Sequence, residues 1–112
     1  MSAALTRLQL DAIREALVGV LPSRSPADVV LKHFFRDRRQ LGSRDRALVA
    51  DTVYAVLRHR RVLEAVTPSA SPRELALAAL VRFQGFGVGP LEPLLRPEER
   101  TWLAALKARD LD

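Results

Sequence analysis

The sequence predicts a single all-α domain, a bundle of five to six helices over residues 1–112. Three observations support this prediction. The 112 residues include 19 Leu and 16 Ala, which form helices readily, and only 5% of the residues are aromatic. Apolar residues recur at helical spacing, without strand-like alternation or an internal repeat. A chain of this length buries about 65% of its unfolded surface, enough for one core without disulfides or metal.

Two amphipathic helices are expected in the first third of the chain. The first spans 6–21, because Thr6 and Gln9 have the spacing of a capping box and the apolar residues that follow share one broad face. The second spans about 26–39, with a serine cap, a first-turn proline and an early acid at its start. It is expected to end before Gly42. Its expected core residues are Val30, Leu31, Phe34 and Phe35.

The third expected helix, 44–66, is the longest, and Ser43 can cap its start. At about 100° per residue, its apolar residues fall within roughly half of the helical wheel. They are Ala47, Val49, Ala50, Val53, Tyr54, Val56 and Leu57. The opposite side is expected to face water and carries Arg44, Asp51, Thr52, Ala55, Arg58 and His59.

Two more helices complete the predicted bundle. A cap, a proline and an acid open the fourth, which spans 71–83. Residues 75–81 are apolar on every side of this helix, so we expect it at the buried centre. The last helix begins near Pro97 with two acids in its first turn and ends with cations at 107–109, which complements the helix dipole. It is expected to bury Trp102, Leu103 and Leu106.

Glycines and prolines make residues 84–93 irregular, and we expect no helix there beyond one short turn at 91–95. Glycines at 85, 87 and 89 would let backbone N–H groups approach an anion, as in phosphate-binding loops. A dinucleotide-binding loop, however, follows a strand and opens directly into a helix. Here a helix precedes the glycines and prolines follow them, so we interpret the segment as a connector.

Composition excludes several classes of chemistry. The absence of cysteine rules out disulfides, thiolate metal sites and thiol catalysis. His33 and His59 are too few to propose a metal site, and no Ser, His and Asp set has a convincing arrangement. We therefore expect no enzyme activity and no cofactor in this chain. The longest apolar run, 75–81, is far shorter than the ~20 residues that span a bilayer, and no signal pattern precedes it, so we expect a cytoplasmic protein without membrane contact.

The cations are mostly arginine and unevenly distributed. Of 18 Lys and Arg residues 16 are Arg, the formal net charge is +5, and residues 24–61 alone carry +6. Guanidinium groups bind phosphate through paired hydrogen bonds, which favours a nucleic-acid partner, although a GC-rich genome also enriches Arg. Eight arginines are the candidate RNA contacts: Arg36, Arg38, Arg39, Arg44, Arg46, Arg58, Arg60 and Arg61.

Two clusters, 36–39 and 58–61, carry this hypothesis. Each lies late in an expected helix, where cations also compensate the helix dipole without any ligand. Arg46 differs, because a cation in the first turn of a helix opposes the dipole. Its charge requires a phosphate oxygen or a carboxylate, for which the candidates are Asp37, Asp45 and Asp51. If the second and third helices pack antiparallel, about 21 Å of helix separates the clusters, and a phosphate backbone could bridge them as one positive surface.

Four segments resemble the N-terminal domain of RsmB/Sun-type RNA cytosine-5 methyltransferases, which is similar to the antitermination factor NusB. They are Ala-Asp-Val-Val-Leu at 27–31, Phe-Phe-Arg at 34–36, Leu-Gly-Ser-Arg-Asp-Arg-Ala at 41–47 and Val-Tyr-Ala-Val-Leu-Arg at 53–58. The resemblance is most specific over 25–63. It implies a NusB-like helical bundle.

The resemblance extends to single residues. Those that match the family's signature are Gly42, Asp45, Arg46, Tyr54 and Arg58. The glycine permits a turn, the aspartate favours the start of a helix, and Tyr54 is expected to pack inward with its hydroxyl bonded. Unlike NusB, the chain has only Arg7 and Arg14 in its first helix, which moves the expected RNA surface to 36–61.

In that family the helical module precedes an S-adenosylmethionine-binding catalytic domain whose nucleophile is a cysteine thiolate, which this chain lacks. The resemblance therefore implies one accessory NusB-like domain, excised from a longer protein or standing alone. Its implied partners are RNA, ribosomal RNA above all, and a methyltransferase catalytic domain or a ribosomal protein.

Two other function classes stay open. The main alternative is a protein-interaction adaptor, suggested by the apolar helix at 75–81 and by Phe86, Val88 and Leu91, which look exposed. A helix-turn-helix DNA-binding protein is third. Gly42 between two expected helices suggests it, but 44–66 is longer than usual for groove reading and contains no Asn or Gln.

Overall fold

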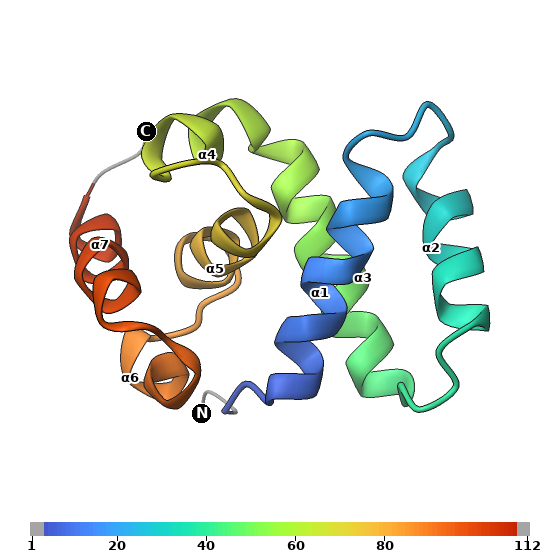
Figure 1. Ribbon diagram of the computed structural model, residues 1–112, viewed down its shortest axis with the longest axis horizontal. Helices are drawn as coiled ribbons and strands as arrows, with labels where there is room; N and C mark the ends of the chain where they lie inside the picture. The colour runs from blue at the N-terminus through green and yellow to red at the C-terminus, as the bar shows by residue number, and fades with distance from the viewer. Residues whose placement is uncertain (1–3, 110–112) are drawn as a thin grey trace.

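The structure, a computed structural model, describes residues 4–109, which form seven α-helices and a 3₁₀ turn without any strand (Figure 1). The all-helical class is therefore confirmed, with more helices than expected. The elements are α1 (Arg7–Val20), α2 (Ala27–Arg36), α3 (Ser43–Arg58), α4 (Arg60–Val66), α5 (Pro72–Arg82), α6 (Val88–Leu91), the 3₁₀ turn η1 (Glu92–Leu94) and α7 (Pro97–Ala108).

Helix α5 lies at the centre of the fold. It contacts α1 and α3 on one side, α7 on the other, and α4 (Figure 1). Each of residues 75–81 is at most 2% exposed, which confirms the prediction from their all-round apolarity. Helices α1, α3, α4 and α7 surround α5, so its apolar side chains are removed from water on every side.

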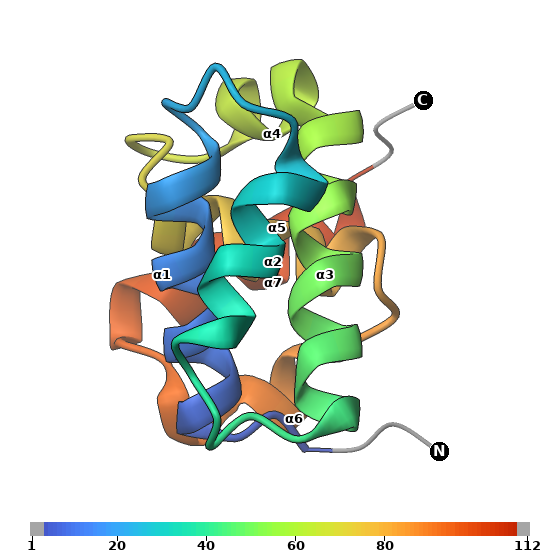
Figure 2. The same ribbon diagram turned by 90° about the vertical axis from the view of Figure 1, so that its right-hand side faces the viewer.

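Helices α1, α2 and α3 form the second half of the molecule, with α1 between α5 and α2 (Figures 1 and 2). The predicted capping box starts α1: the Thr6 hydroxyl accepts from the Gln9 N–H, and the Gln9 side chain accepts from the Thr6 N–H, both at 3.0 Å. In α2, Leu31 and Phe34 are buried as expected, whereas Val30 and Phe35 are only half-buried.

The expected helix 44–66 is two helices, because the chain turns at His59. There φ is −113° and ψ is 24°, so α3 ends at Arg58 and α4 begins at Arg60. The His59 ring stacks on Phe83 at the end of α5, with ring centroids 3.8 Å apart and planes 7° from parallel. The turn also directs α4 onto α5, which buries Leu63 completely. A long-range contact therefore overrides a locally helical sequence.

The buried face of α3 is rotated from the expected one. Its buried residues are Val49, Thr52, Val53 and Val56, at the i, i+3, i+4, i+7 spacing of a helix held between two neighbours. Thr52, expected to face water, is fully buried, and its hydroxyl donates to the Leu48 carbonyl at 2.8 Å, which satisfies it internally. Tyr54, expected to pack inward, is 45% exposed.

Two further boundaries differ from the sequence prediction. Helix α2 ends at Arg36, so the second and third arginines of the 36–39 cluster lie in a turn and not in a helix. The segment 84–93, expected to have no helix beyond a short turn at 91–95, contains that turn as η1 and α6 as an additional helix. Its prolines occupy first turns, where a missing N–H costs no helical hydrogen bond, and the tight turn buries Leu91 completely.

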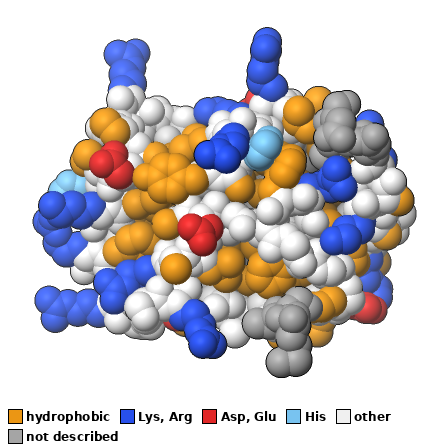
Figure 3. Space-filling view, turned by 180° about the vertical axis from the view of Figure 1, so that it is seen from behind, with side chains coloured by type: hydrophobic (Ala, Val, Ile, Leu, Met, Phe, Trp, Pro, Cys, Tyr) orange, Lys and Arg blue, Asp and Glu red, His pale blue; other side chains and the backbone are white. Residues whose placement is uncertain are grey.

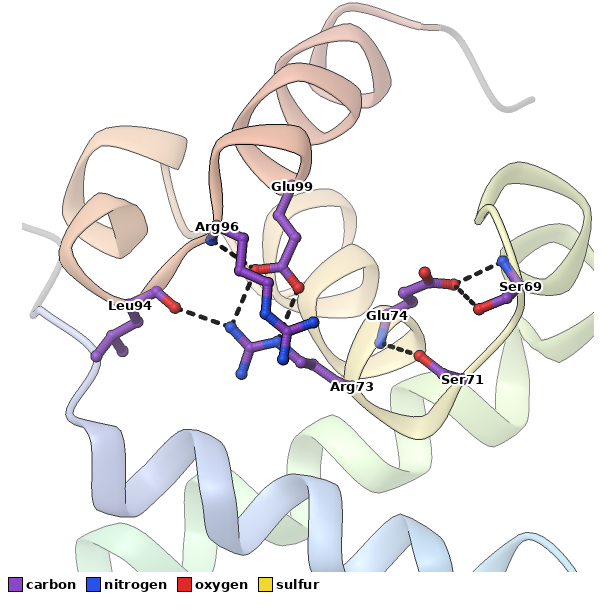
Figure 4. A network of polar contacts seen from close by, with 7 residues as sticks. All are labelled: Ser69, Ser71, Arg73, Glu74, Leu94, Arg96 and Glu99. Atoms are coloured by element: carbon purple, nitrogen blue, oxygen red, sulfur yellow. Dashed lines mark hydrogen bonds and ion pairs between the residues drawn. The ribbon is translucent and has the colours of Figure 1, made fainter.

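A buried ion pair joins α5 to α7 (Figure 4). Arg73 Nε donates to Glu99 Oε2 at 2.8 Å and its Nη2 donates to Glu99 Oε1 at 3.0 Å and to the Leu94 carbonyl at 2.8 Å. Glu99 also accepts from the Arg96 N–H at 2.8 Å. The hydrogen bonds from Arg73 hold the pKa of Glu99 below its ordinary value, although burial opposes this. This pair stabilises the packing of α7.

Among the helices described, none combines the length and the apolar composition that a bilayer crossing requires.

Candidate nucleic-acid interface

The turn from α2 to α3 gathers four of the predicted arginines. Arg36 ends α2, Arg38 and Arg39 lie in the turn, and Arg46 lies in the first turn of α3. Together with the side chains of Phe35 and Leu41, they line a shallow hollow of about 290 Å³, which we call the turn hollow. The structure thus places Arg46 beside the 36–39 cluster.

One arginine of the turn hollow is already neutralised within the protein. Arg38 Nη2 donates to Glu15 Oε1 of α1 at 3.1 Å, and its guanidinium lies 3.9 Å from the centre of the Phe34 ring. A guanidinium over an aromatic face is attracted by the ring's quadrupole. Arg38 therefore fastens the turn to α1 and has less freedom to bind a ligand than its neighbours.

The other three arginines of the turn hollow are exposed, and no ion pair within residues 4–109 involves them; they are Arg36, Arg39 and Arg46. None of the three carboxylates considered for Arg46 is paired with it in this range. Asp45 instead accepts from the Gln9 side chain at 2.9 Å and from the Gly42 N–H at 3.1 Å. Three guanidinium groups thus face solvent around one hollow.

The second cluster lies where α3 gives way to α4. Arg58 ends α3, so the dipole of α3 still accounts for its charge without a ligand. Arg60 and Arg61 instead open α4, where cations oppose the dipole, so the expectation that they lie late in a helix is wrong. Arg60 Nε donates to Glu64 Oε2 at 3.1 Å, one turn later in α4. Arg58 and Arg61 are exposed and take part in no ion pair among the described residues.

The two clusters stay apart. They lie at opposite ends of α3 (Figure 2). About 21 Å of helix separates Arg44 from Arg58. Arg44 is exposed at the end nearer the turn hollow. Figure 3 shows Lys and Arg side chains at separate places around one face of the molecule, with hydrophobic groups between them. The arginines therefore form two positive sites, one near each end of α3, and not one continuous surface.

A second hollow of about 370 Å³ lies beside the α3–α4 break, which we call the stacked-ring hollow. It is lined by Asp51, Tyr54, Ala55, Arg58, His59, Phe83 and Gln84. Sequence reasoning assigned most of its α3 residues to the solvent-facing side but did not recognise a site. The rest of its lining, Phe83 and Gln84, comes from the end of α5. No local sequence pattern indicates that Phe83 contacts His59.

Metal binding has no candidate here: within the described residues, no group of three or more His, Asp or Glu side chains could hold an ion. Comparison with models of protein families, with curated proteins and with solved structures finds no significant match to this chain.

Proposed function

We propose that this chain is an RNA-binding module that positions structured RNA, ribosomal RNA in particular, for an S-adenosylmethionine-dependent cytosine-5 methyltransferase, and that it performs no chemistry itself. The observation that supports RNA binding is the turn hollow, where Arg36, Arg39 and Arg46 are exposed without an internal ion pair. Guanidinium groups bind phosphate oxygens bidentately, so such a site fits a polyanion backbone.

The phosphate contacts would provide affinity and register with little sequence preference. RNA helices are recognised largely by shape and backbone, which suits two positive sites held at a fixed separation along α3. The methyltransferase part of the proposal rests on the resemblance of residues 25–63 to the accessory domain of that family. A reading frame that continues past residue 112 into an S-adenosylmethionine site with two cysteine motifs would support it.

Salt-dependent binding to a ribosomal RNA hairpin tests the RNA function. Replacing Arg36, Arg39 and Arg46 with Ala removes three phosphate contacts, so the slope of log affinity against log salt should become shallower by about 2 to 3. The matched control removes the same charge at three exposed arginines outside the hollow, Arg7, Arg24 and Arg109. Equal slopes for the two triple variants would refute the assignment of the turn hollow.

The alternative of a protein-interaction adaptor loses its main support. Of the three residues that look exposed in the sequence, Leu91 is fully buried, and Phe86 and Val88 are half-buried against the core. The apolarity of 75–81 is explained by the central position of α5. The exposed large hydrophobic residues are scattered over α1 to α4: Leu8, Val18, Val29, Tyr54 and Val62.

A further inference from the structure

The stacked-ring hollow combines flat rings with groups that form directional hydrogen bonds. His59 and Phe83 stack with centroids 3.8 Å apart, and Tyr54, which is 45% exposed, lines the same space. The hollow's volume of about 370 Å³ is in the range of pockets that hold small organic molecules. A planar aromatic ligand therefore matches its walls better than a flexible chain or a compact anion does.

The polar groups of the stacked-ring hollow narrow the chemical class of its ligand further. Asp51 is exposed and takes part in no ion pair within residues 4–109, so its carboxylate is available as an acceptor only. It repels free anions but accepts hydrogen bonds from an amino group, as carboxylates do from the N4 amino group of cytosine. The amide of Gln84 supplies one further acceptor and two donors.

Arg58 lines the hollow together with Asp51, and no ion pair joins the two side chains. They lie seven residues apart on α3, which places them two helical turns apart on one face. Seven residues of helix rise about 10 Å, so a ligand that satisfies both charges needs a ring amino group and a phosphate separated by roughly that distance. An unpaired nucleotide has this arrangement.

We infer that the stacked-ring hollow binds one unpaired nucleotide whose base carries an exocyclic amino group. The base stacks on the aromatic wall, its amino group donates to Asp51, and its phosphate contacts Arg58. Uracil, which has a carbonyl oxygen in place of the amino group, would present an acceptor to the carboxylate and is disfavoured. This inference rests on the proposed RNA function and adds a base-reading site to the phosphate contacts of the turn hollow.

Titration of the 112-residue chain with mononucleotides, followed by NMR, tests the inference without a long RNA. Cytidine monophosphate should shift the ring resonances of Tyr54 and His59. Uridine monophosphate should bind at least about fivefold more weakly, because it loses the hydrogen bond to Asp51 and turns a carbonyl oxygen toward that carboxylate. Inorganic phosphate should leave the Tyr54 ring unchanged. Equal shifts with the two nucleotides, or none with either, would overturn the inference.

Two variants check which groups carry the binding. Tyr54→Ala should weaken cytidine monophosphate about tenfold, and the side chain's exposure means that circular dichroism should show an intact fold. Asp51→Asn should remove the preference for cytidine over uridine, because the amide offers both a donor and an acceptor. The control is Asp28→Asn, which replaces an exposed carboxylate on α2 and should keep the preference for cytidine over uridine. A preference that survives Asp51→Asn would contradict the role of that carboxylate.

Because the probe is a mononucleotide, this experiment fails or succeeds independently of the salt-slope test. A steep salt slope without nucleotide shifts at Tyr54 and His59 would remove the base site and leave RNA binding by the turn hollow in place. Nucleotide shifts together with equal slopes for the two triple variants would retain the base site and remove the turn hollow.

Discussion

The ion pair between Arg73 and Glu99 should be the polar contact on which the fold depends most. Glu99 is 4% exposed, and its carboxylate accepts three hydrogen bonds, two of them from Arg73. Removing one partner of a buried pair costs about 3–5 kcal/mol, because the other charge remains uncompensated. The Arg73 side chain keeps 19% of its exposure and can recover some hydration, so we expect a loss near the lower limit, about 3 kcal/mol, for Glu99→Ala.

The free energy of unfolding should also depend on pH through this carboxyl. Its pKa is lowered in the folded protein, chiefly by the hydrogen bonds from Arg73. The unfolded state therefore binds the proton more tightly, so the contribution is complete above the ordinary carboxyl pKa and is lost as the pH falls through the folded pKa. Glu99→Gln removes this titration. The stability difference between wild type and Glu99→Gln should stay constant above about pH 5 and shrink below it.

Urea unfolding and thermal melts followed by circular dichroism measure both effects. A loss of about 3 kcal/mol lowers the melting temperature of a domain of this size by about 12 °C. The control is Glu64→Ala, which removes an exposed carboxylate paired with Arg60 and should cost under about 0.5 kcal/mol. The double variant Arg73→Met/Glu99→Leu should be more stable than Glu99→Leu alone, because no unpaired guanidinium remains. Similar losses for Glu99→Ala and Glu64→Ala would refute the reasoning.

Four other substitutions test the fold at separate points, each by its change in the urea midpoint. Leu80→Ala leaves a cavity in the fully buried centre of α5 and should cost about 2–5 kcal/mol; a loss under 1 would show that the core collapses around it. Thr6→Ala removes the acceptor for the Gln9 N–H and should cost about 1 kcal/mol, whereas no change would mean that this cap contributes nothing. Gly85→Ala should cost about 1 kcal/mol although an added Cβ meets open space, because φ is +76° there. Gly89→Ala, also in open space but without a positive φ, should leave the stability unchanged or slightly raised. A larger loss for Gly89→Ala than for Gly85→Ala would contradict this account.

Most of the fold could be predicted because the signals for it are local. A capping box at Thr6 and a serine cap at Ser71 fix where two helices start, and both are present in the structure. The seven apolar residues at 75–81 indicate burial on all sides, and no partner needs to be known for that conclusion. Capping signals thus predict where helices start, and apolarity on all sides predicts which helix lies at the centre.

The errors occur where a distant contact decides. Position 59 has no proline or glycine to end a helix, and the helix ends there because His59 stacks on Phe83, 24 residues later. Tyr54 counts as an apolar residue in the sequence pattern. The helices on either side of α3, however, set the rotation of α3 about its axis and leave Tyr54 exposed. Thr52 counts as a polar residue in the sequence pattern. It can be buried at little energetic cost because its hydroxyl donates to the Leu48 carbonyl.

The candidate site was predicted in part for the same reason. Arg39 and Arg46 flank one short turn, so their proximity follows from the sequence. The pairing of Arg38 with Glu15, by contrast, joins residues 23 positions apart and could not be inferred from either segment.

The distribution of carboxylates explains why the remaining arginines are available to a ligand. Asp45, the acid nearest Arg46 in sequence, is occupied by the Gln9 side chain and the Gly42 N–H, where it helps to start α3. The acids that do pair with candidate arginines, Glu15 and Glu64, each take one and leave its neighbours uncompensated. Positive charge thus accumulates at both ends of α3. Because the two sites share no side chain, each end of α3 should contribute independently to the affinity for a polyanion.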